Sequence, residues 1–204
     1  EGTIWCWGRN TSGQLGLGTV DGDPHPTPQI IPGTKDFYGI TAGADHFCAT
    51  TWQGEISCWG ANEAGQIGTG TVGGNVPTPT KVAGLKKFKS IAAGGANTCV
   101  LPYTMKPICW GDGNAAQTEI ATKDMHVLVA SGVSTCAFGW TENPGRCWPG
   151  AAAGAVANLD GLADVQAFGS THNSFCAIAK TVTAATNKTY SDAKSLQCWG
   201  ENAT

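Results

Sequence analysis

The stretch CWGRNTSGQLGLGT, residues 6–19, returns with few changes as CWGANEAGQIGTGT at residues 58–71. A Cys-Trp pair recurs three more times, and Gly follows the tryptophan at four of the five places. The five tryptophans, at intervals of 52, 51, 38 and 51 residues, are Trp7, Trp59, Trp110, Trp148 and Trp199. Internal repetition with a period of about 40–50 residues is typical of propellers, solenoids and arrays. The opening stretch is therefore a repeated structural unit, not a single binding motif.

Each repeat also carries a predicted β-hairpin. In the first repeat, HFCATT (46–51) and ISCWG (56–60) lie on either side of a Gly-containing turn, and alternating segments around such a turn favour a hairpin. Only 13% of the residues are charged, and the abundance of Gly, Thr and Trp favours strands and turns over long helices. We therefore expect an all-β fold. Its repeat units would cover residues 7–58, 59–109, 110–147 and 148–198.

These residues resemble the repeats of the regulator of chromosome condensation family. The similarity rests on CWGRNTSGQLGLGT and on AGADHFCATTWQGEISCWGANEAGQIGTGT, is strong over the first two units, and weakens at WGDGNAAQTEI and WPGAAAGAVANLDG. The resemblance implies a β-propeller of four-stranded blades, each of about 40–52 residues, belonging to a seven-bladed propeller. The paired cysteines are more similar to the extracellular, crinkly-type repeats of plant receptor kinases than to the nuclear members.

The nine cysteines predict a set of disulfides. Spacings of 10, 10, 11 and 22 residues place two cysteines on facing strands of each hairpin, within reach of a disulfide. The predicted bonds are Cys48–Cys58, Cys99–Cys109, Cys136–Cys147 and Cys176–Cys198. None of the spacings is the C-x2-C of a zinc site. Four disulfides indicate an oxidising compartment, either extracellular or on the cell surface.

The ends of the sequence raise a separate expectation. The chain begins and ends on a CWG strand, so Cys6 lacks the partner strand that precedes the other four cysteine–tryptophan pairs. One interpretation is that residues 1–204 are a fragment of a longer chain, whose missing blade pairs with Cys6. The other is that Cys6 forms its disulfide with a different chain.

Three glycosylation sequons, like the disulfides, indicate passage through the secretory pathway. Asn10, Asn187 and Asn202 each begin an Asn-x-Ser/Thr triplet in a predicted surface turn, where a glycan can be attached. The sequence therefore predicts a secreted glycoprotein.

Composition argues against two classes of partner. The net charge is −3 and the densest basic run is LKKFK at 85–89, so the footprint of a phosphate-binding surface is missing and nucleic acid is not expected. No apolar run approaches the ~18 residues of a membrane span, so this segment is not expected to insert into a membrane. The first residues also lack the basic, apolar pattern of a secretory leader.

The polar residues do not predict a catalytic or metal site. His46 lies two residues before a cysteine, but Asn97, Ser134 and Ser174 hold the same place in later repeats, which a catalytic histidine would not need. Asp21 and Asp23 flank a Gly in a pattern that marks turns more often than it binds a cation. GQLGLGT and GQIGTGT lack the strand-to-helix context and the lysine of a phosphate loop. We expect no enzyme activity, cofactor or metal.

Two tryptophans are candidates for an interface. Trp52 and Trp140 fall at predicted hairpin tips, where a large aromatic side chain is exposed, and exposed aromatics are enriched at protein interfaces. The sequence thus favours a non-enzymatic extracellular scaffold that binds proteins, as part of a cell-surface or matrix assembly or of a receptor ectodomain. The alternatives are a nucleotide-exchange factor for a small GTPase, as the family's nuclear members are, and a secreted enzyme inhibitor.

Overall fold

The computed structural model describes most of the chain and is all-β over that part. It describes residues 2–122, 124–132, 134–139, 145–150, 157–159, 162–170, 174–182 and 190–200. Within these ranges the regular elements are all strands. Trp140, Asn187 and Asn202 lie outside the described residues.

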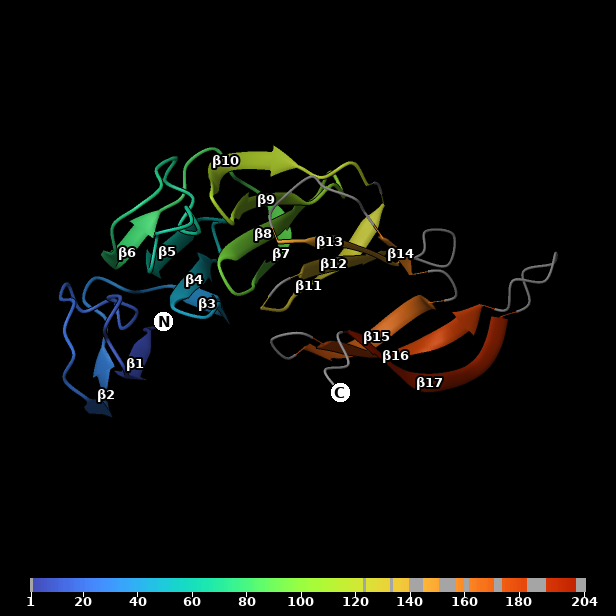
Figure 1. The fold of residues 1–204 in the computed structure, drawn as a ribbon, viewed down its shortest axis with the longest axis horizontal. Coiled ribbons are helices and arrows are strands. Elements are labelled where there is room, and N and C mark those ends of the chain that lie inside the picture. The colour runs from blue at the N-terminus through green and yellow to red at the C-terminus, as the bar shows by residue number, and fades with distance from the viewer. Residues whose placement is uncertain are drawn as a thin grey trace.

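Within the described ranges, seventeen strands form five antiparallel sheets (Figure 1). The first sheet has two strands, β1 (Trp5–Gly8) and β2 (His25–Ile30). The second contains β3 (Phe37–Ala42), β4 (His46–Thr51), β5 (Ile56–Gly60) and β6 (Val76–Lys81). The third contains β7 (Phe88–Ala93), β8 (Asn97–Pro102), β9 (Ile108–Gly111) and β10 (Asn114–Glu119). These sheets are the blades expected from the repeat.

The last two sheets continue the same pattern. The fourth contains β11 (Met125–Ala130), β12 (Ser134–Gly139), β13 (Gly145–Pro149) and β14 (Ala157–Leu159). The fifth contains β15 (Leu162–Ser170), β16 (Ser174–Val182) and β17 (Tyr190–Gly200). The blades follow one another along an arc from β1–β2 to β15–β17 (Figure 1).

Each four-stranded sheet takes strands from two successive sequence units. β3, β4 and β5 close one unit, and β6 belongs to the next, so each sheet straddles the Cys-Trp pair of its third strand. In the first two sheets the outermost strand carries prolines, for example Pro77 and Pro79 in β6. Proline lacks a backbone N–H and is tolerated at an edge, where one side of the strand needs no partner.

The four predicted disulfides are present, each between residues directly opposite on the second and third strands of a blade. Cys48 faces Cys58 and Cys99 faces Cys109, each pair with a Cα–Cα distance of 4.1 Å. The other two bonds, Cys136–Cys147 and Cys176–Cys198, have Cα–Cα distances of 4.0 Å. Cys6 is the free cysteine of the described residues, and it is buried.

The core lies between blades, where the repeat tryptophans are buried. The side chains of Trp59, Trp110 and Trp148 are at most 1% exposed. The indole nitrogen of Trp59 donates to the carbonyl oxygen of Gln14 at 3.0 Å, and that of Trp110 to Gln66 at 2.8 Å. These glutamines belong to the GQLG and GQIG turns, so each turn receives the tryptophan of the next blade.

The same turns are stabilised by an asparagine. Asn62 Oδ1 accepts from the amide of Ile67 at 3.2 Å, and its Nδ2 donates to the carbonyl oxygens of Thr71 and Gly73. Asn10 holds the first turn in the same way. In each Gly-rich run the backbone is therefore held by the side chain of an asparagine just before it. This supports a structural role and not a phosphate site.

Candidate functional site

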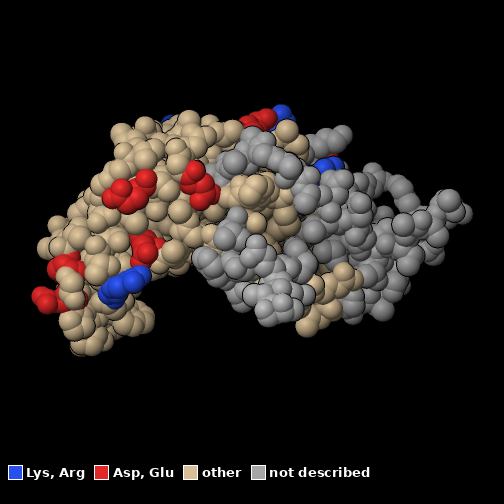
Figure 2. All heavy atoms as spheres, viewed as in Figure 1, with Lys and Arg blue, Asp and Glu red and all other residues tan. Residues whose placement is uncertain are grey.

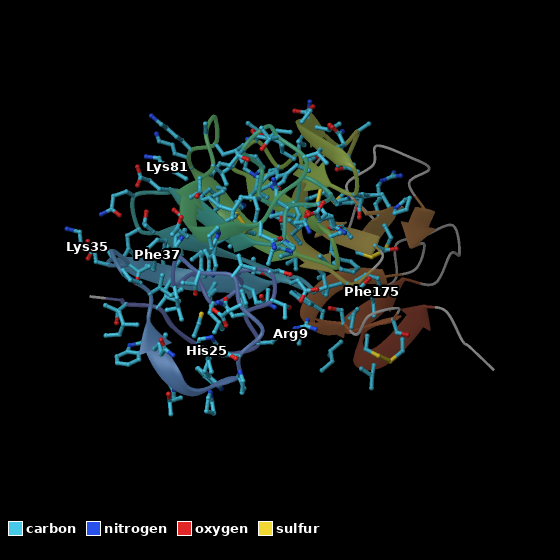
Figure 3. The ribbon with its side chains drawn as sticks, turned by 60° about the vertical axis from the view of Figure 1, so that its left-hand side comes forward. Arg9, His25, Lys35, Phe37, Lys81 and Phe175 are labelled. Carbon is cyan, nitrogen blue, oxygen red and sulfur yellow. A yellow bond between two sulfur atoms is a disulfide. The ribbon has the colours of Figure 1, made fainter. Side chains whose placement is uncertain are left out.

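The polar residues considered as chemical candidates are engaged in structural contacts. Asp21 accepts hydrogen bonds from Asn10 Nδ2 at 2.8 Å and from Thr19 Oγ1 at 2.9 Å, and it pairs with His25 Nε2 at 2.7 Å. These contacts, led by the one from His25, lower the pKa of Asp21 to about 2. Figure 3 shows His25 on β2 in the first sheet. The Asp21 carboxylate is thus directed at protein donors.

His46 is a buried core residue. Its side chain is fully buried, and its Nε2 lies 2.9 Å from Thr98 Oγ1 on the next blade. The Thr98 hydroxyl donates its one proton to the carbonyl oxygen of Gln66, so His46 Nε2 must be the donor in its contact with Thr98. Burial lowers the pKa of His46 to about 4. The residue joins two blades and is out of reach of a substrate.

The described part of the chain holds no group of three or more His, Cys, Asp or Glu that could bind a metal ion. The described residues also form no helix that is long and apolar enough to span a membrane. On the face seen in Figure 2, charged side chains are sparse and scattered.

Glycosylation at Asn10 stays a prediction, and the structure shows what surrounds this side chain. The Asn10 side chain is fully buried, and its Nδ2, the atom that would carry a glycan, donates to Thr19 and Asp21. A sequon identifies a residue by its neighbours, whereas this asparagine is the internal cap of a Gly-rich turn. The sequons at Asn187 and Asn202 lie outside the described residues.

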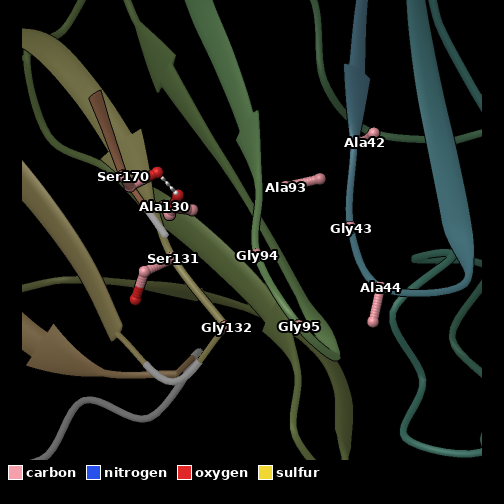
Figure 4. A pocket seen from close by; sticks show the side chains of 10 residues that line it. All are labelled: Ala42, Gly43, Ala44, Ala93, Gly94, Gly95, Ala130, Ser131, Gly132 and Ser170. Carbon is pink, nitrogen blue, oxygen red and sulfur yellow. Dashed lines mark hydrogen bonds between the residues drawn. The ribbon is translucent and has the colours of Figure 1, made fainter. Parts of the chain in front are cut away.

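Small residues line a hollow where the first strands of successive blades meet. Its ten lining residues, shown in Figure 4, are Ala42, Gly43, Ala44, Ala93, Gly94, Gly95, Ala130, Ser131, Gly132 and Ser170. The volume is about 260 Å³. Backbone hydrogen bonds cross from blade to blade here, from Ala44 N to Gly95 O and from Gly95 N to Ser131 O, both at 3.0 Å. The lining carries no titratable side chain, and its small residues let the blades approach closely.

Exposed aromatic side chains gather at the β4–β5 hairpin. Trp52, at the tip, is 75% exposed and stacks on Tyr38 of β3, with ring centroids 4.2 Å apart. The turn is held by the amides of Gly54 and Glu55, which donate to the carbonyl and the hydroxyl oxygen of Thr51. Trp52 is therefore presented on a preorganised turn, as predicted for an exposed hairpin tip.

A second aromatic occupies the same position in the next blade. Tyr103 follows the last residue of β8 as Trp52 follows the last residue of β4, and it is 62% exposed. Trp140 follows β12 in the same way along the sequence. Each of these aromatics lies six residues after the equivalent positions His46, Asn97 and Ser134. The repeat is hard to see in the sequence because the aromatic is Trp in two units and Tyr in one.

A hollow of about 260 Å³ extends this surface toward the first sheet. It is lined by Trp5, Tyr38 and Ile40, together with Thr3, Ile4, Phe37 and Gly39. Trp5 and Ile40 are more than half exposed. We call Trp5, Tyr38, Ile40, Trp52 and Tyr103 the tip surface. A rigid apolar surface of this kind can bury aromatic side chains against another protein.

The chain matches the family described as the regulator of chromosome condensation (RCC1) repeat at residues 1–50 and 53–101. A second description of the same repeat matches residues 38–66. The chain belongs to the RCC1 repeat family. The matches cover its first two units, where the sequence resemblance is strongest.

Known proteins agree with this membership. The Xenopus laevis protein RCC2 homolog is 36% identical over 84 residues, which cover 40% of this chain and 16% of that protein. The chain spans between 13% and 27% of the length of the curated relatives it matches. The crystal structure of human WBSCR16 superposes with a TM-score of 0.75 at 15% identity, over 97% of this chain and 57% of that one.

An extracellular structure is also similar. The ectodomain of the Physcomitrella patens receptor kinase CR4 gives a TM-score of 0.55 at 23% identity, over 91% of this chain and 44% of that one. At these identities the structures show a shared fold, and the propeller predicted from the sequence is confirmed.

Proposed function

We propose that this chain is a non-enzymatic extracellular scaffold that binds a protein partner through its tip surface. The observation that carries the proposal is the stacked pair of Tyr38 and Trp52, which is rigid, exposed and continuous with a hollow. Rigid aromatics lose little conformational entropy on binding and dominate the energetics of interfaces. The described residues offer no nucleophile, base and orienting group in one place that would support catalysis instead.

The disulfides support the extracellular part of the proposal. Each blade from β3 onward has a bond between its second and third strands, and such bonds persist in oxidising compartments. The fold similarity to a receptor-kinase ectodomain points the same way. The assembly would be a cell-surface or matrix structure, or the ligand-binding part of a receptor.

Site-specific photocrosslinking tests the binding surface. A photoreactive amino acid replaces Trp52 or Tyr103 in the protein as expressed in the organism that produces it. The same replacement at Val72 serves as the control. Val72 is 52% exposed, but it lies in the loop that leaves β5 at the end opposite the hairpin tip. We expect one partner to crosslink from positions 52 and 103 and not from 72. Equal crosslinking from all three positions would refute the tip surface.

Thiol trapping and a nucleotide-exchange assay test the rest of the proposal. Free thiols are alkylated at once in native material, and peptides are then mapped without reduction, with the expectation that all four bonds are found. The purified chain should also leave the release of labelled GDP from small GTPases unchanged. Nine alkylated cysteines together with accelerated GDP release would replace the scaffold with an intracellular exchange factor.

A further inference from the structure

Charged side chains are segregated between the two ends of the blades. We call the end at which the second strand of a blade turns into the third the tip end, because Trp52 and Tyr103 lie there. Since neighbouring strands are antiparallel, the chain also enters each first strand at this end. Within residues 2–122 every lysine lies at the tip end, in these connections or close to them in a strand: Lys35, Lys81, Lys86, Lys87, Lys89 and Lys106.

The opposite end of the blades carries the opposite charge. Over the same residues its one Lys or Arg side chain is Arg9, which forms an ion pair with Asp45. Figure 3 shows Lys35 and Lys81 on one side of the molecule and Arg9 away from them. The acidic residues of this end are Asp21, Asp23, Asp45, Glu63 and Asp112. This part of the protein therefore has a basic end and an acidic end.

Much of the positive charge at the tip end is not neutralised within the chain. Lys81 pairs with Glu55, and Lys106 pairs with Glu119 at 2.9 Å. Asp36 is the other carboxylate at this end of residues 2–122. The exposed lysines that form no ion pair with a described carboxylate are Lys35, Lys86, Lys87 and Lys89.

Lys87 connects the positive charge to the exposed aromatics. Its carbonyl oxygen accepts from the amide of Tyr103 at 3.3 Å. The hairpin of the preceding blade is also close, because a Cβ added to Gly54 would lie 3.2 Å from the backbone nitrogen of Lys87. The backbone of Lys87 is therefore held against both hairpin tips, those of Trp52 and Tyr103. Its side chain is exposed, so its charge is presented beside the two aromatics.

The backbone conformation of Lys87 is unusual for a lysine. Its φ is +58°, in the left-handed region. The residues at the same place, just before β3 and β11, are Asp36 and Asp124, with φ of +63° and +57°. Aspartate adopts this region more readily than lysine, because its short side chain can form local hydrogen bonds. Lysine thus brings no local advantage here and reverses the charge found in the neighbouring blades, which points to a role for that charge at the surface.

We propose that the tip surface binds an acidic segment of its protein partner. An aromatic or apolar side chain of the segment packs against Trp52 and Tyr103, and flanking Asp or Glu side chains pair with Lys86 and Lys87. The inference rests on the proposed function and names the chemistry of its partner. Apolar anchors supply most of the binding energy at such a surface, whereas complementary charge sets orientation and speeds association.

A protein carboxylate fits this surface better than a nucleic acid or a sulfated polysaccharide. Polyanions are bound by dense tracks of Lys and Arg that follow a phosphate or sulfate backbone. The tip end of residues 2–122 carries lysines interrupted by Glu55 and Glu119, and no arginine. Its few unpaired charges lie next to aromatic side chains, as an isolated acidic segment with an apolar residue requires.

Fluorescence anisotropy with designed peptides tests this chemistry. The probe is the fluorescein-labelled peptide GDEEFEEDG, and its matched control, GNQQFQQNG, replaces every acid by its amide. The target is the purified chain with its four disulfides intact, at physiological ionic strength. We expect the acidic peptide to bind at least ~10-fold more tightly than the amide peptide, because several weak surface ion pairs act together. This preference should shrink as salt is added.

Variants locate the binding. Lys87→Asn should reduce the affinity for the acidic peptide by about 3–10-fold and leave the melting temperature the same or higher, since Asn suits the left-handed backbone. Arg9→Gln removes the same charge from the opposite end and should leave the affinity unchanged. Trp52→Ala should weaken the binding of both peptides, because it removes an apolar contact that they share.

Three outcomes would overturn the inference. They are equal affinities for the acidic and the amide peptide, no binding of the acidic peptide at ~1 mM, and equal losses for Lys87→Asn and Arg9→Gln. Tighter binding of heparin or of a single-stranded oligonucleotide, unaffected by Trp52→Ala, would assign the lysines to a polyanion instead. Photocrosslinking from position 52 does not depend on the partner's charge. A partner captured there, together with equal peptide affinities, would therefore refute this inference and leave the proposed function standing.

Discussion

The buried histidine between two blades should make the protein sensitive to mild acid. The pKa of His46 is about 4 in the folded protein and 6.5 in a solvated chain. Between these values the unfolded chain binds a proton that the folded chain excludes. Stability is therefore fully present above pH 6.5 and is lost as the pH falls toward 4. The difference of about 2.5 pKa units corresponds to a loss of about 3 kcal/mol.

The structure supplies the matched variant. Asn97 occupies the place of His46 in the following blade and is fully buried there, so His46→Asn keeps a polar group without a titrating ring. The free energy of unfolding would be measured by urea denaturation at steps from pH 8 to pH 4 for both proteins. Because His25, His126 and the carboxylates are common to both, the difference between the two curves isolates His46.

The expected result is a wild-type curve that falls relative to His46→Asn by about 3 kcal/mol, with the change beginning near pH 6.5. The absolute offset at pH 8 reports packing and does not bear on the argument. Parallel curves across the whole range would refute it, because they would mean that His46 can be protonated in the folded state without cost.

Three further outcomes follow from the packing. Trp110→Ala should cost about 3–5 kcal/mol in guanidinium denaturation, as for other buried aromatics, whereas Trp7→Ala at the equivalent exposed position should stay within about 0.5 kcal/mol; similar losses would contradict the blade assignment. Replacing Cys99 and Cys109 by Ala removes a bond that closes a ten-residue separation, and the free energy of unfolding should fall by about 2–3 kcal/mol. Gly43→Ala should lower the melting temperature, since a Cβ there would overlap both the His46 ring and the carbonyl oxygen of Gly94 on the next blade; an unchanged melting temperature would show that both neighbours can move aside.

The repeat allowed much of the fold to be predicted. The Cys-Trp pair fixes the register of the third strand, and the Gly turn before it fixes the hairpin, so Cys48 and Cys58 had to lie opposite each other. Both are local relationships, encoded within about ten residues. The burial of Asn10 could not be predicted in this way, because it depends on a turn closed by Asp21, eleven residues later.

The tip surface was predicted only in part, for a related reason. Trp52 and Trp140 stand out as tryptophans, but Tyr103 shares their position and is concealed by the change of residue type. The stacking of Tyr38 on Trp52 joins β3 to the hairpin tip, and the hollow beside it joins β3 to β1 across a blade boundary. A sequence repeat defines what each blade contains, whereas these contacts depend on how one blade faces the next.

The difference between what a blade contains and how it faces its neighbour also separates Trp7 from Trp52, although both side chains are exposed. Trp7 occupies a position that is buried in the blades beginning at β3 and β7, so its exposure differs from that of its counterparts. Trp52 occupies a position that is exposed in the next blade as well, as Tyr103 is, so its exposure belongs to the architecture of the blade. The exposed hairpin tip is therefore a feature that successive blades share, which is why the proposed function places the partner at Trp52 and not at Trp7.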